Sequence, residues 1–402
     1  REDQYALAKV SLLAEQPERT IEICQDLIQD DEQDGLVHAT LGEAFMSLSN
    51  TEEALHHLDK ATQFSPHQAF SWLALARTLK NADKSEKSLE TLRAATHAVP
   101  KDPNIFYALA ENYLEQDEYS KALPVLQEAH RLVIDQKGDG NPTTLNQELI
   151  TSSQIIPRIS LELGKTLQAL GHHSEAQHVL SAAYSAYPAY RGLAYSYAKS
   201  LLSLDDFASA IPPLVIAVQA EPDELAPNLD FGRALLEAKT HPQEAVRVLT
   251  KALEIAPSVP IIKALLAEAL MDSGNTEQAM QTYSQVLESD LMDEPEWMGR
   301  ISHGFGRSAL ALEKPEIAIA SLQEAVRVQP QNPEIFQTLA EAYTTAELTK
   351  EALEAAHTAK QLAPDDVENL TWFANTVFQL EKPEEAIPAL TRAIQILSLI
   401  HI

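Results

Sequence analysis

The chain has little cysteine and no long apolar run. Cys24 is the only cysteine among 402 residues, so no internal disulfide can form. One cysteine favours a reducing compartment such as the cytoplasm slightly, although it also fits a periplasmic or secreted protein. No stretch approaches the roughly 18 uninterrupted apolar residues of a membrane-spanning helix, and the start at Arg1 lacks a signal-peptide pattern. We therefore expect no membrane span.

Positive charge is also scarce. Lys and Arg together number 30 against 59 Asp and Glu, which gives a formal net charge of -29. Such acidity argues against binding to nucleic acid or to an anionic membrane, because the phosphates would be repelled. Solubility is the simplest explanation for the excess of acids.

The motifs of common catalytic and metal sites are missing. The sequence has no glycine-rich phosphate loop, no nucleophile elbow and no His-Glu-x-x-His string, so we expect no enzyme activity and no cofactor. A calcium loop at 135–146 is a poor match because Lys137 occupies a ligand position. A zinc site needs several converging ligands, and we interpret the paired and clustered histidines as surface residues instead: His56, His57, His172, His173 and His178.

What the chain does have is a residue pattern that recurs every 34 residues. Position 8 of each of eleven successive repeats is Gly or Ala, position 20 is always small, and position 27 is Ala in nine repeats. Seven repeats then close on a proline. The position-8 residues are Ala8, Gly42, Ala76, Ala110, Gly164, Ala198, Gly232, Ala267, Gly306, Ala340 and Ala374.

This pattern predicts a helix-turn-helix unit. Two helices can cross closely only where a small side chain lets their backbones approach, while larger neighbours such as Leu75 and Leu92 fill the core. A proline after the second helix ends it and forces the turn into the next repeat. With this period and these positions, residues 1 to about 400 resemble the tetratricopeptide repeat family. The resemblance implies an all-α fold, an α-solenoid of eleven helix pairs forming a right-handed superhelix, that acts as a non-catalytic protein-binding scaffold.

The register of the repeats breaks at two larger insertions, which divide the chain. We expect repeats 1 to 4 at 1–136, a loop with a helical extension at 137–156 and repeats 5 to 8 at 157–293. A short insertion at 294–298 and repeats 9 to 11 at 299–402 follow. The first insertion opens on a turn-forming stretch and could begin a helix at Thr143 or Thr144.

In the tetratricopeptide family, positions 2, 5, 9 and 12 of the first helices usually line a concave groove. Between residues 158 and 307, six of those positions carry Lys or Arg, which is a local reversal of the sign of the whole protein. We therefore predict a track that holds an acidic segment or a C-terminal carboxylate of a protein partner through charge-assisted hydrogen bonds. The alternative is that neighbouring acids, such as Glu162 or Asp230, neutralise these cations. The candidate groove residues are Tyr107, Arg158, Lys165, Tyr195, Lys199, Arg233, Arg300 and Arg307.

The last residues of the chain suggest a second class of function. A solenoid normally needs a polar face on its terminal repeats, yet large aliphatic residues crowd the end of the sequence. Three readings remain open: the natural protein continues beyond residue 402, this chain is the recruitment domain of a larger multidomain protein, or copies associate end to end. Truncation is the simplest of these readings. The residues of the possible assembly end are Ile396, Leu397, Leu399 and Ile400.

Overall fold

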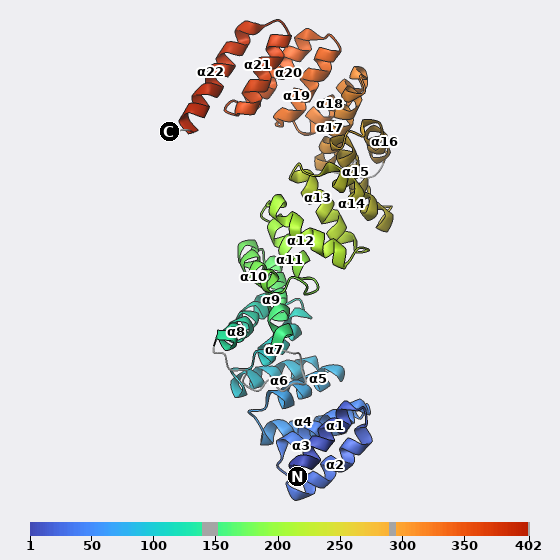
Figure 1. The fold of residues 1–402 in the computed structure, drawn as a ribbon, viewed down its shortest axis with the longest axis vertical. Coiled ribbons are helices and arrows are strands. Elements are labelled where there is room, and N and C mark those ends of the chain that lie inside the picture. The colour runs from blue at the N-terminus through green and yellow to red at the C-terminus, as the bar shows by residue number, and fades with distance from the viewer. Residues whose placement is uncertain (139–151, 289–294, 401–402) are drawn as a thin grey trace. The chain divides into compact units, whose positions relative to one another are not determined.

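The computed structural model describes residues 1–138, 152–288 and 295–400, and these residues form 22 helices and no strand (Figure 1). They group into two compact units, Arg1–Asp205 and Asp206–Ile402. The predicted all-α solenoid of helix pairs is thereby confirmed. Unit 1 contains α1 (Glu2–Leu13), α2 (Pro17–Asp30), α3 (Gly35–Ser47), α4 (Thr51–Phe64), α5 (Ala69–Asn81), α6 (Ser85–Ala98), α7 (Pro103–Leu114), α8 (Tyr119–Gly138), α9 (Ser152–Ala169), α10 (His173–Ala186) and α11 (Leu193–Leu202).

Unit 2 repeats the same alternation of first and second helices, beginning with the second helix of repeat 6. It contains α12 (Phe207–Ala220), α13 (Leu225–Glu237), α14 (Pro242–Ile255), α15 (Pro260–Asp272), α16 (Thr276–Leu287), α17 (Pro295–Ala311), α18 (Pro315–Val328), α19 (Pro333–Thr345), α20 (Thr349–Leu362), α21 (Val367–Gln379) and α22 (Pro383–Ile400). No helix in the described parts of the chain is long and apolar enough to cross a bilayer.

Local sequence explains where the helices begin and end. Asp34 caps α3 by accepting hydrogen bonds from the amides of Leu36 and Val37, which satisfies two of the free donors of the first turn. The seven closing prolines all lie two residues beyond the last residue of a second helix, as the repeat pattern predicts. They are Pro66, Pro100, Pro188, Pro222, Pro257, Pro330 and Pro364.

In the four repeats with glycine at position 8, that glycine lies against the leucine at position 24. A Cβ atom added to Gly164 would lie 2.4 Å from Cγ of Leu180, and one added to Gly232 would lie 2.5 Å from Cγ of Leu249. Leu180 and Leu249 are fully buried. The small residue is therefore the contact that lets the two helices of a repeat approach.

First helices of neighbouring repeats also contact one another. In unit 1, α3 contacts α1 and α5, α5 contacts α7, and α9 contacts α11; in unit 2, α15 contacts α13 and α17, and α17 contacts α19. Within the described ranges, second helices of neighbouring repeats make no comparable contact. The first helices therefore form the closely spaced row of each unit, and we call its exposed side the groove face.

Residues 295–298 of the second insertion form the start of α17, whereas most of the first insertion falls outside the described residues. The helix start predicted at Thr143 or Thr144 lies in that part of the chain, as does residue 294. On the near sides, α8 continues to Gly138 and α9 begins at Ser152, five residues before the expected start of repeat 5. Residues 152–156 thus extend the first helix of that repeat.

Candidate functional site

Arg158 is the most highly connected cation on the groove face of unit 1. From α9 it reaches back to α7, where its Nε donates to Oη of Tyr107 at 2.9 Å and its Nη2 donates to Oε1 of Glu111 at 2.7 Å. Its guanidinium also lies over the Tyr107 ring, 4.6 Å from the centroid. Tyr107 is buried, and this burial raises the pKa of its hydroxyl, which stays protonated. Arg158 therefore joins repeats 4 and 5 and has part of its charge neutralised.

The other two cations of the predicted track in unit 1 differ in their partners. Lys165 of α9 forms an ion pair with Glu162, one helical turn earlier, at 2.9 Å. Lys199 of α11 is exposed and makes no ion pair with any residue that the structure describes. Tyr195 lies one turn before Lys199 and is half-buried. Of the cations in unit 1's predicted track, Lys199 is thus the one whose charge is least neutralised by acidic side chains.

In unit 2, Arg300 of α17 is clamped by two acids. Its Nε donates to Oε2 of Glu268 at 2.9 Å and its Nη2 donates to Oε1 of Glu237 at 3.1 Å, while Trp297 lies beside its guanidinium. Burial raises the pKa of the Glu268 carboxyl, and the charge of Arg300 opposes that rise. The contacts join α13, α15 and α17, so Arg300 connects three repeats.

Arg307 and Arg233 are held less tightly. Arg307 lies 3.8 Å from Oδ1 of Asp272, and both side chains are partly exposed. Arg233 of α13 is exposed and forms no ion pair within the described ranges of the chain. Arg233 in unit 2 is therefore the counterpart of Lys199 in unit 1, an exposed cation of the predicted track without an ion pair among the described residues.

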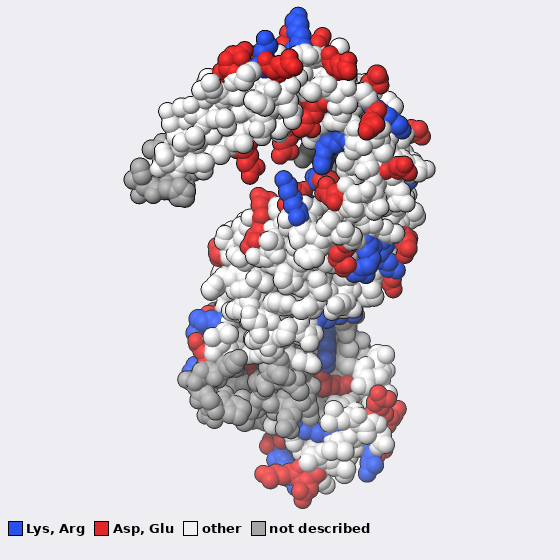
Figure 2. Space-filling view, turned by 45° about the horizontal axis from the view of Figure 1, so that its top comes forward, with Lys and Arg blue, Asp and Glu red and all other residues white. Residues whose placement is uncertain are grey.

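Pairing with acids of a neighbouring first helix extends beyond the predicted track. Arg77 pairs with Glu43 and Lys80 pairs with Glu115, so these cations too join adjacent repeats. On the face that Figure 2 shows, Lys and Arg groups repeatedly lie beside Asp and Glu groups. Sequence reasoning named Glu162 as a neutralising acid but missed Glu111, Glu237, Glu268 and Asp272 as partners of the track.

The histidines give a mixed result. His56, His172 and His178 are exposed, as expected for surface residues. The surface interpretation is wrong for His57, whose side chain is 16% exposed, because its ring is packed between α3 and α4 against His38. No group of three or more potential metal ligands lies close together in the described parts of the chain.

Family models match most of the chain. A tetratricopeptide repeat model matches residues 73–136, 161–228 and 303–367, and a second tetratricopeptide repeat model matches residues 238–298. The chain belongs to the tetratricopeptide repeat family. No curated protein matches it significantly over its sequence.

Several solved structures are similar to this tetratricopeptide repeat protein. Yeast Tom70 has 15% identity, a TM-score of 0.38, and coverage of 98% of this chain and 93% of that one. Pseudomonas aeruginosa pilF has 16% identity, a TM-score of 0.40, and coverage of 50% and 88%. YrrB, described as a TPR protein with an unusual peptide-binding site, has 19% identity, a TM-score of 0.35, and coverage of 46% and 91%. Fewer than one residue in five is shared in each case, so the partners of those proteins are not transferred to this chain.

Proposed function

We propose that this protein is a non-catalytic scaffold that binds an acidic protein or peptide segment on the groove face of unit 1. The observation that carries the proposal is Lys199, an exposed cation without an ion pair in the described residues of a chain of net charge -29. Arg158 and Lys165 stand on the neighbouring first helix. Membership of a repeat family that builds extended binding surfaces supports the scaffold role.

The three cations would contribute unequally. A hydrogen bond to a charged group contributes about 1.5–3 kcal/mol, but a partner's carboxylate has to compete with Glu111 for Arg158 and with Glu162 for Lys165. Among the described residues, Lys199 has no such competitor. We therefore assign Lys199 the anchoring role, with Tyr195 and Tyr107 supplying aromatic contacts and Arg158 mainly holding the surface in shape.

A double charge reversal tests this assignment. Lys165→Glu together with Lys199→Glu should reduce partner recovery in affinity capture by the full chain by at least about tenfold, since two attractive charges become repulsive. The matched control is Lys121→Glu, which makes a single reversal on the second helix α8, where Lys121 is 57% exposed. Equal recovery with the double variant and the control would overturn the proposed site.

For unit 2 the same reasoning proposes Arg233 as a partner contact and gives Arg300 and Arg307 weaker roles. Arg233 has no ion pair in the described ranges, while Arg300 is held by Glu237 and Glu268. Affinity capture with an Arg233→Glu variant, run beside the Lys165→Glu, Lys199→Glu double variant, would show whether this second cation contributes to binding.

End-to-end association of copies of this chain is a second candidate function, and an exposed aliphatic surface on α22 favours it. Four aliphatic residues there recur at helical spacing and are 41% to 66% exposed: Ile387, Leu390, Ile394 and Leu397. Of the predicted assembly residues, Leu397 belongs to this surface, Ile396 packs on the core of unit 2, and the side chains of Leu399 and Ile400 lie outside the description. Light scattering that finds a monomer at all concentrations would contradict this candidate.

A further inference from the structure

Repeat 2 contains a pair of contacting histidines, one buried and one half-buried, that no other repeat has. His38 lies on α3 at position 4 of the repeat and His57 lies on α4 at position 23, and none of the other ten repeats has histidine at either position. Repeat 4 has Phe106 and Val125 there instead. His38 is only 2% exposed, so a titratable pair occupies a place where the other repeats have apolar or uncharged side chains, except for Lys263 at position 4 of repeat 8.

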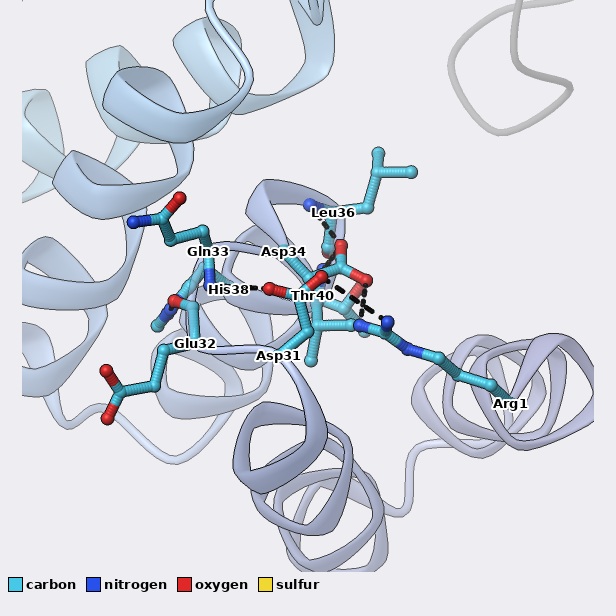
Figure 3. Close-up of polar contacts among 9 residues, drawn as sticks. Arg1, Asp31, Glu32, Gln33, Asp34, Leu36, His38 and Thr40 are labelled. Carbon is cyan, nitrogen blue, oxygen red and sulfur yellow. Dashed lines mark hydrogen bonds and ion pairs between the residues drawn. The ribbon is translucent and has the colours of Figure 1, made fainter.

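The hydrogen bonds of the pair fix its protonation state. Nε2 of His38 lies 3.0 Å from the carbonyl oxygen of Glu32 (Figure 3), and because a carbonyl only accepts, Nε2 must carry the proton. Neutral His38 therefore has its lone pair on Nδ1. Nδ1 of His57 lies 2.9 Å away and has to be the donor, which leaves Nε2 of His57 unprotonated.

This arrangement resists added protons. A proton on Nδ1 of His38 would set two N–H groups against each other across 2.9 Å. A proton on Nε2 of His57 keeps the bond, but it places a charge between stacked rings, with Phe45 on one side and His38 on the other. The pair therefore accepts at most one proton while α3 and α4 remain packed, and even the first is opposed by burial.

The surrounding charges only partly offset the free-energy cost of protonating the pair. On α4, Oε2 of Glu53 lies 3.9 Å from Nε2 of His57, whereas His56 and Lys60 oppose a positive charge there. At the start of α3, Asp34 favours a charge on His38, but its carboxylate already caps the helix and accepts from Arg1 at 2.8 Å (Figure 3). Burial is the largest influence on both rings, and it lowers the pKa of His57 to about 4 and also lowers the pKa of His38.

We propose that the His38–His57 pair makes repeat 2 sensitive to acid. Protonation of the pair separates α3 from α4 while the neighbouring repeats stay folded. The sign follows from linkage: the pKa of His57 is lower in the folded state than its ordinary value of 6.5, so the unfolded repeat binds more protons. Stability is full above about pH 6.5 and falls as the pH drops towards 4. Acid would thereby loosen repeat 2 and any binding that depends on it.

Hydrogen exchange of the full chain at pH 7.5 and pH 5.0, corrected for intrinsic rates, tests the proposal. From the His57 pKa alone, the opening equilibrium of α3 and α4 should rise about 30-fold between these pH values. Repeat 3, which has Trp72 and Thr91 at the same two positions, is the internal reference. Equal changes in repeats 2 and 3 would overturn the proposal without any variant.

A double variant separates the histidines from the carboxylates that also titrate in this range. His38→Phe with His57→Val gives repeat 2 the residue types of repeat 4, and its excess acid-induced opening should disappear. The exposed neighbour His56, changed to Asn, is the matched control: its repulsion of a charge on His57 is a smaller influence than burial, so most of the 30-fold rise should remain. If the double variant is unfolded at pH 7.5, His57→Asn replaces it, since its amide N–H can still donate to His38. An undiminished rise in the variant would contradict the assignment to this pair.

Discussion

Replacing Gly164 by valine is expected to destabilise unit 1 by about 3 kcal/mol, in the range of strongly overpacked cores. A Cβ atom at this position would lie 2.4 Å from both Cγ and Cδ2 of Leu180, and the added methyl groups of valine cannot avoid the same side chain. Leu180 is fully buried and cannot turn into solvent. The two helices α9 and α10 would have to separate.

A rescue variant checks this cause. Leu180→Ala alone should cost about 2–5 kcal/mol because it opens a cavity, but combined with Gly164→Val it should recover part of both losses. Repeat 10 already has small residues at both places, Ala340 and Ala356. Urea unfolding of the full chain, with hydrogen exchange localising the loss to α9 and α10, gives the four free energies. Strict additivity would contradict a direct contact between the two positions.

The repeat period alone predicted the helix crossings and ends, because it reports packing. Only Gly or Ala fits the close helix contact at position 8, and a proline two residues beyond a second helix ends that helix. Both features are therefore visible in the sequence of every repeat that has them. The turn between the two helices of a repeat has a weaker sequence signal. Position 15 is in the left-handed region in all eleven repeats, yet only Gly171 and Gly274 are glycines there, and Glu15, Ser49 and Asp83 take the same conformation.

The candidate site was less predictable because charge pairing depends on neighbours distant in sequence. The period placed Arg158 and Arg300 on the first helices, but their acids lie up to 63 residues away, at positions 9 and 13 of other repeats. Which cation stays unpaired, as Lys199 does among the described residues, is decided by where each long side chain reaches. For the buried His38 a signal was present: histidine stands where other repeats have Trp72, Phe106 or Phe336.

Arg300→Met is the second change expected to have a large effect. It removes the cation between Glu268 and Glu237 and leaves the partly buried Glu268 without its partner. Breaking a fully buried pair costs about 3–5 kcal/mol, and because the Arg300 side chain is 37% exposed we expect about 2 kcal/mol. The matched control is Arg307→Met, whose 3.8 Å pair with Asp272 is more open to solvent and should contribute less than about 1 kcal/mol.

The pH dependence of the Arg300→Met variant identifies Glu268 as the cause. Burial already raises the pKa of Glu268 in the folded protein, and loss of Arg300 should raise it further, because desolvation then acts unopposed. With a raised pKa, the folded state binds the proton more tightly than the unfolded state. The penalty is therefore full above the folded pKa and disappears below the unfolded value near 4.5. Urea unfolding at pH 7.5 and pH 5.0 should show the variant regaining stability relative to the Arg307→Met control. A variant that instead loses stability on acidification would show that the cost arises elsewhere, in lost packing against Trp297.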